Sequence, residues 1–96
     1  DLRLKNIEGD ITDAVMALSC IRPVKYNWKR DNGCGRTYLG VIAQDVIEVL
    51  PEVVDVDRDA CAYMGIRYSD ITPVLIKAIQ EQQCTINILK TCIGIA

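Results

Sequence analysis

The 96-residue sequence contains no phenylalanine, no histidine and a single tryptophan, Trp28. Four tyrosines are the remaining aromatic residues, so the hydrophobic core must come mainly from isoleucine, valine and leucine. The absence of histidine excludes Ser-His and Cys-His catalytic pairs, and any general base must therefore be a lysine, an aspartate or a glutamate.

The five cysteines are odd in number and form no CxxC pair: Cys20, Cys34, Cys61, Cys84 and Cys92. Without histidine, this pattern argues against a zinc site, and it equally argues against a secreted scaffold stapled by disulfides. We therefore expect free thiols in a reducing compartment, no bound metal and no cofactor.

Long apolar runs and basic stripes are also absent. No stretch approaches ~18 uninterrupted apolar residues, so we expect no membrane-spanning segment. The net charge is -2, and we interpret the charges as dispersed, which argues against a nucleic-acid partner. The length and the composition fit one globular domain, but a chain of this size buries only about 60–65% of its unfolded surface. We therefore expect oligomerisation to add to the stability of the fold.

The first half of the chain predicts a helix followed by a β-hairpin. Residues 9–21 carry Ile11, Val15 and Leu18 at helical spacing, with Asp10 or Thr12 as the expected N-cap. RPVKYNWKR (22–30) alternates like a half-buried strand. DNGCG (31–35) then supplies a turn that tolerates positive φ, and TYLGVIAQ (37–44) returns as the second strand.

Further along, residues 43–54 predict a short helix stopped by Pro51, and residues 63–68 predict another strand. Gln44, at the junction of strand and helix, is interpreted as a structural amide, with support of a functional site as the alternative. Asp55, Asp57 and Asp59 alternate like the ligands of a calcium loop. The glycine and the distal glutamate of such a loop are absent, so we interpret these residues as a solvated loop tip.

The last segment, residues 69–96, shows a heptad pattern. Isoleucine occupies the a positions and Leu, Gln and Leu the d positions, in the order Leu75, Ile79, Gln82, Ile86, Leu89 and Ile93. Ser69 or Asp70 is the expected N-cap, and Pro73 suits a first helical turn. The pattern predicts a helix of about 25 residues, roughly 37 Å long. It either forms a coiled coil or packs as an ordinary amphipathic helix on its own domain.

Five blocks of the sequence, taken in order, resemble one known family. They are D-L-R-L-K-N-I at 1–7, Y-N-W at 26–28, G-V-I-A-Q-D-V at 40–46, L-P-E-V-V at 50–54 and I-R-Y-S-D-I-T-P-V-L-I-K-A-I at 66–79. Together they resemble the C-terminal intramolecular chaperone, or auto-processing, domain of phage tailspikes, endosialidases and neck appendages. A related domain occurs in membrane-bound transcription factors of the myelin-regulatory type. The resemblance covers essentially the whole chain.

The resemblance implies a homotrimeric domain that directs the folding of the upstream fibre domain in the host cytoplasm. It also implies release by self-cleavage at a Ser-Asp junction. The family motif reads S-D-x-R-L-K, which Asp1, Arg3, Leu4 and Lys5 match, with the serine expected immediately before Asp1. We therefore expect that the chain begins where it is cut, with an arbitrary boundary as the alternative. Without the serine, it should be inactive as a protease. Lys5 is followed directly by Asn6, one residue shorter than is common in the family.

In this family the lysine pairs with the serine, which assigns Lys5 as the general base. A free lysine has a pKa near ~10.4, so burial or a neighbouring cation must lower it before the amine can accept a proton. Arg3 is expected to supply the cation, and Leu2, Leu4 and Ile7 the apolar surroundings. Without the motif, Lys5 would be read as a solvated surface lysine.

The sequence thus predicts an α+β chaperone domain over residues 1–96, with a globular part at 1–68 and a trimerising coiled-coil helix at 69–96. Its expected partners are two further copies and the upstream fibre. Two alternatives stay open: a structural trimerisation tip that is never cleaved, and a domain that frees a transcription factor from a membrane.

Overall fold

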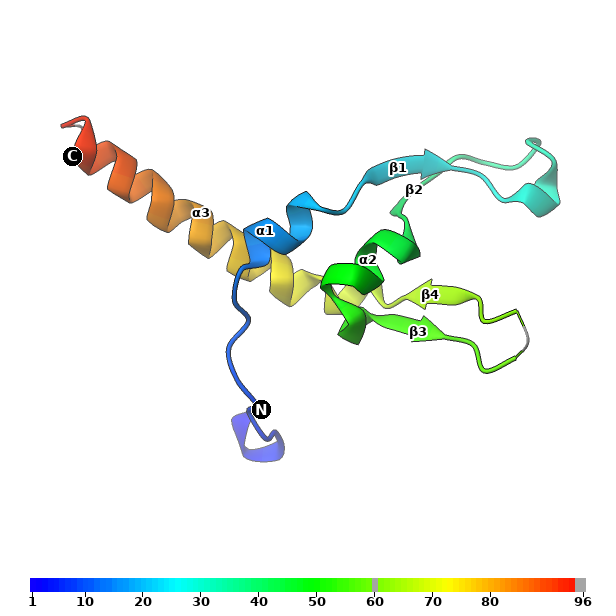
Figure 1. Cartoon of the computed structure of the whole chain (residues 1–96), viewed down its shortest axis with the longest axis horizontal. Coiled ribbons are helices and arrows are strands. Elements are labelled where there is room, and N and C mark those ends of the chain that lie inside the picture. The colour runs from blue at the N-terminus through cyan, green and yellow to red at the C-terminus, as the bar shows by residue number, and fades with distance from the viewer. Residues whose placement is uncertain (60, 95–96) are drawn as a thin grey trace.

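The computed structural model describes residues 1–59 and 61–94, and within them it contains three α-helices and two antiparallel β-hairpins (Figure 1). The helices are α1 (Ala14–Ser19), α2 (Ala43–Val49) and α3 (Thr72–Cys92). The strands are β1 (Pro23–Tyr26), β2 (Tyr38–Val41), β3 (Val54–Val56) and β4 (Met64–Ile66). Short 3₁₀ turns cover Leu2–Leu4, Lys29–Asp31, Pro51–Val53 and Tyr68–Asp70. The predicted α+β fold with a long C-terminal helix is confirmed, although residues 95 and 96 of the predicted helix lie outside the described residues.

The β1–β2 hairpin follows the predicted alternation and turn. Pro23 pairs with Val41 and Tyr26 with Tyr38, and the side chains of β1 alternate between exposed and half-buried. Asn32 and Gly33 take the positive φ values expected of this turn, 49° and 77°. The first strand is shorter than predicted, because the chain enters a 3₁₀ turn at Lys29 instead of continuing to Arg30.

The β3–β4 hairpin follows α2, which ends before Leu50 and Pro51 as predicted. Val54 pairs with Ile66, which confirms the strand expected near residues 63–68. Arg67 then ties this hairpin to the start of α3: its guanidinium bonds the carboxylates of Asp55 and Asp70, the latter at 2.8 Å, and a backbone carbonyl of the preceding turn.

The predicted helix caps are wrong at both places. Asp10 and Thr12 do not cap α1. The helix starts after Asp13, whose backbone is in the left-handed conformation with φ 54°. A carboxylate from α3, Glu81, accepts the first free N–H groups of α1 instead. Ser69 and Asp70 do not cap α3 either. They lie in a preceding 3₁₀ turn, where the Asp70 side chain is engaged by Arg67. Pro73 does occupy the first turn of α3.

The buried core is thin. Among the described residues, only five hydrophobic side chains are buried: Ala14, Val46, Val53, Val74 and Ala78. The radius of gyration is 17.8 Å, against about 12.5 Å for a compact chain of this length. The accessible surface is 8116 Å², against about 5,500 Å² for a compact monomer of this mass. A single copy is therefore elongated and leaves most of its apolar side chains in contact with water.

Candidate functional site

The N-terminal motif forms a small closed unit. The Asp1 carboxylate accepts a hydrogen bond from the Arg3 backbone N–H at 2.9 Å, which caps the 3₁₀ turn over Leu2–Leu4. The same carboxylate pairs with the Arg3 guanidinium, with Nη2 and Oδ2 2.6 Å apart. Arg3 therefore holds the side chain of the residue that follows the predicted cleavage point.

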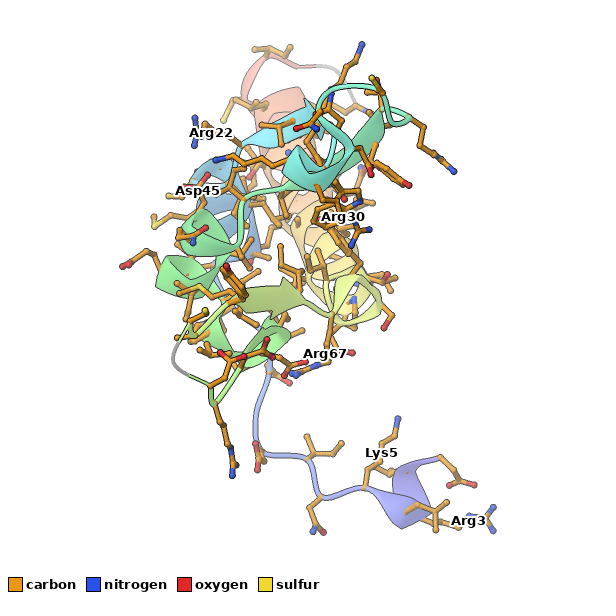
Figure 2. The ribbon with its side chains drawn as sticks, turned by 90° about the vertical axis from the view of Figure 1, so that its right-hand side faces the viewer. Arg3, Lys5, Arg22, Arg30, Asp45 and Arg67 are labelled. Carbon is orange, nitrogen blue, oxygen red and sulfur yellow. The ribbon has the colours of Figure 1, made fainter. Side chains whose placement is uncertain are left out.

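Lys5 comes directly after this turn, in extended backbone with φ -122° and ψ 139°. Figure 2 shows Lys5 and Arg3 on a segment that lies apart from the rest of the chain. Leu2, Leu4 and Ile7, the predicted apolar surroundings of Lys5, are 74%, 87% and 66% exposed. In a single copy, Lys5 is thus in water, and these three apolar side chains do not cover it. Its assignment as the general base stays a prediction.

Gln44 lies at the second position of α2, at the strand-to-helix junction that the sequence predicts. Its side chain is exposed, on a different element from the N-terminal motif. The neighbouring Asp45 pairs with Arg22 at 3.3 Å, which links α2 to the residue before β1 (Figure 2). No described contact joins Gln44 to Lys5, and a role for Gln44 in the site stays a prediction.

The heptad positions of α3 form an uncovered stripe, which we call the seam. The polar member, Gln82, is exposed, and the five apolar members are 45% to 68% exposed: Leu75, Ile79, Ile86, Leu89 and Ile93. A neighbouring face of α3, with Val74 and Ala78, is the one that packs on α1. The helix therefore has one apolar face covered within the chain and a second without cover, and the coiled coil stays a prediction.

Glu81 joins α1 to α3, a role that was not predicted from the sequence. Its two carboxylate oxygens accept hydrogen bonds from the backbone N–H groups of Val15 at 2.9 Å and Ala14 at 3.1 Å. These two bonds, that of Val15 first, lower the pKa of Glu81 below its usual value. A signal was present in the sequence, because Glu81 continues the helical face of Val74 and Ala78.

The β1–β2 hairpin carries an aromatic cluster. The rings of Tyr26 and Tyr38 stack with centroids 5.5 Å apart, and Trp28 meets Tyr26 edge-on at 5.3 Å. Arg30 lies over the Trp28 ring at 5.1 Å and Arg36 over the Tyr38 ring at 4.6 Å. The alternation of residues 22–30 predicted a half-buried strand here, but it did not indicate the two arginines that cover the cluster.

The five cysteines are all unpaired and exposed. Among residues 1–59 and 61–94, no group of three or more potential metal-ligating side chains gathers, and no helix is long and apolar enough to cross a membrane.

Comparisons with known proteins agree with the resemblance found in the sequence. The family model described as chaperone of endosialidase matches residues 1–55. The long tail fiber protein Gp37 of Enterobacteria phage M1 is 34% identical over 88 residues, and the protein of the same name from Enterobacteria phage Ox2 is equally similar. The alignment covers 91% of this chain but 35% of each relative, so the chain spans about a third of the length of the curated relatives it matches. The chain belongs to the chaperone of endosialidase family.

Proposed function

We propose that this chain is a homotrimeric intramolecular chaperone for a viral tail fibre joined to its N-terminal side, and that it is released by self-cleavage before Asp1. Membership of the family supports the chaperone role, and the likeness to long tail fibre proteins supports a tail fibre as the protein that it helps to fold. The observation that carries self-association is the seam on α3, where five large apolar side chains are 45% to 68% exposed in a single copy.

The physical advantage of such a domain lies in folding kinetics. Intertwined fibres depend on contacts between distant residues and between chains, so they fold slowly and expose strand edges on the way. A domain that associates first turns the meeting of three fibre chains into an effectively intramolecular event. Folding would take place in the host cytoplasm. Release of the domain afterwards leaves the fibre protected by its unfolding barrier.

The match to the family motif supports the cleavage step. A serine before Asp1 would supply the hydroxyl, and Lys5 would accept its proton, in a reaction whose net result is hydrolysis of one peptide bond. Because Lys5 is in water in a single copy, its activation would wait until assembly covers the segment. Arg3 would hold Asp1 through the 2.6 Å ion pair and so orient the bond to be cut.

The experiment is expression of a precursor that contains the fibre, the native junction and this chain, followed by a denaturing gel. Lys5→Ala should abolish release, since the chain has no histidine to substitute as a base. The uncut protein should still be a trimer, because Lys5 contributes nothing to the buried core. Lys90→Ala, which removes an exposed lysine from the last turn of α3, serves as the control and should leave release intact. Complete cleavage of a trimeric Lys5→Ala precursor would refute the Ser-Lys mechanism.

A further inference from the structure

Charge is separated along the middle of the chain. Residues 22–41 contain five basic side chains and one acidic side chain, a net charge of +4. Residues 42–66 contain six acidic side chains and one basic side chain, a net charge of -5. Within the described residues, only the pair of Arg22 and Asp45 joins the two segments. The interpretation of the charges as dispersed is therefore wrong, because basic and acidic residues gather in separate segments. Most of this complementarity is unused inside one copy.

The basic segment contains the β1–β2 hairpin, which projects away from the three helices (Figure 1). We call residues 23–41 the arm. Trp28 is 43% exposed near its turn, and the arm also presents four exposed cations: Lys25, Lys29, Arg30 and Arg36. The two arginines already lie over aromatic rings, which restrains them and reduces the conformational entropy that binding would cost. The arm thus presents aromatic surface bordered by positive charge.

A groove with the opposite character lies between residues 8–13, α1, the end of α2 and the start of α3. Apolar side chains contribute to its lining, among them Ala14, Leu50, Val53 and Val74. Five of its lining residues are acidic and none is basic: Glu8, Asp10, Asp13, Glu52 and Asp70. Asp70 is already paired with Arg67, whereas the other four make no ion pair among the described residues. No residue of the arm lines this groove.

We propose that the arm of one copy docks in this groove of another copy. The aromatic cluster would cover the apolar lining, and the cations of the arm would meet the acidic residues around it. A second copy is the occupant because the same chain carries both complementary surfaces and leaves both of them open. Each copy would give one arm and receive one, a head-to-tail contact that closes into a ring. The inference rests on the proposed self-association and adds a contact separate from the seam.

Native cysteines allow a direct test. Cys34 lies in the turn of the arm and Cys20 lines the groove, and both thiols are exposed. The full chain with Cys61, Cys84 and Cys92 changed to serine is treated with a bismaleimide cross-linker and run on a denaturing gel. We expect covalent dimers and trimers, which disappear when either Cys34 or Cys20 is also changed to serine.

Charge exchange tests the chemistry of the contact. Arg30→Glu with Arg36→Glu should reduce the yield of cross-linked product about tenfold, since each reversal turns an attraction into a repulsion. Adding Asp10→Arg and Glu52→Arg should restore it. The matched control is Arg58→Glu, a reversal of an exposed charge outside the arm, which should leave the yield unchanged.

Sedimentation of the same samples separates the possible failures. A trimer without a cross-link between Cys34 and Cys20, or with products that survive Cys20→Ser, overturns the docking of the arm and leaves the proposed function standing. A monomer overturns both. In the precursor, a cross-link from Cys34 to the upstream fibre in place of Cys20 would identify the fibre as the occupant and refute the inference.

Discussion

Substitution of Gly40 by alanine tests how β2 is held against the segment that leads into α3. A Cβ at Gly40 lies 2.6 Å from the Tyr68 hydroxyl oxygen and 2.9 Å from Cε1 of Tyr26. The hydroxyl also accepts a hydrogen bond from the Val41 backbone N–H at 3.2 Å, so the Tyr68 ring cannot retreat without losing that bond. Overpacking costs about 1–3 kcal/mol and a lost hydrogen bond about 1 kcal/mol. Because Tyr68 is half exposed and can move outward, we expect a loss of about 2 kcal/mol.

Thermal unfolding at one fixed protein concentration measures this loss, which should lower the melting temperature by roughly 8–16 °C. The matched control is Gly65→Ala in β4, where a Cβ meets nothing within 4 Å, and it should change stability by less than about 0.5 kcal/mol. In a Tyr68→Phe background, which lacks the closest obstacle, the cost of Gly40→Ala should fall to about half. If the Gly40→Ala and Gly65→Ala variants have the same melting temperature, the predicted clash at Gly40 is refuted. If Gly40→Ala is equally destabilising in the Tyr68→Phe background, the Tyr68 hydroxyl is not the cause of the loss.

Three further outcomes are expected. Glu81 has a lowered pKa in the folded chain, so its contribution to stability is present above its ordinary value of 4.5 and is lost as the pH falls through the folded value. Melting temperatures recorded against pH should therefore drop in acid, and the drop should be smaller in Glu81→Gln. An equal drop in the variant would mean that other groups cause the loss of stability in acid. Gln82→Leu should raise the melting temperature and loosen the choice of oligomer in sedimentation, whereas an unchanged or lower temperature would place Gln82 outside the seam. Arg3→Ala should slow release of this chain from the precursor in a time course without stopping it, and a wild-type rate would leave Arg3 without a role.

Those parts of the fold that depend on neighbouring residues could be predicted from the sequence. The β1–β2 hairpin follows from alternation and from Asn32 and Gly33, which are suited to positive φ. The end of α2 follows from Pro51, and the long α3 from its apolar period with Pro73 in the first turn. These signals are local because they reside in backbone preferences and in the period of one element.

The helix caps and the charge pattern could not be predicted in the same way. Local propensity predicted Asp10 or Thr12 as the cap of α1. The carboxylate that accepts the free N–H groups belongs instead to Glu81, which lies 66 to 67 residues further along the chain than the two donors. Only tertiary packing brings it there. The groove likewise combines residues 8–13 with elements about 40 to 65 residues further along, so its acidic character is invisible to a scan for charge runs. A count of charge by segment would have found the basic arm.

The exposed environment of Lys5 has a related origin. A motif identifies the residue type that the chemistry needs, but its surroundings depend on what packs over it. In one copy the apolar neighbours Leu2 and Leu4 are in water, so the motif alone does not create a dry site. Under the proposed function, activation of Lys5 therefore depends on assembly, and assembly depends on the seam.

Sedimentation equilibrium of the 96-residue chain measures whether the domain assembles as a trimer through the seam. We expect a mass three times that of the 10.7 kDa chain. Association should weaken when Ile79 and Ile86, which are 66% and 45% exposed in a single copy, are changed to serine. Changing Ile88, an exposed isoleucine outside the heptad positions, should have a smaller effect. A stable monomer or dimer of the unaltered chain at micromolar concentration would refute the proposed trimer.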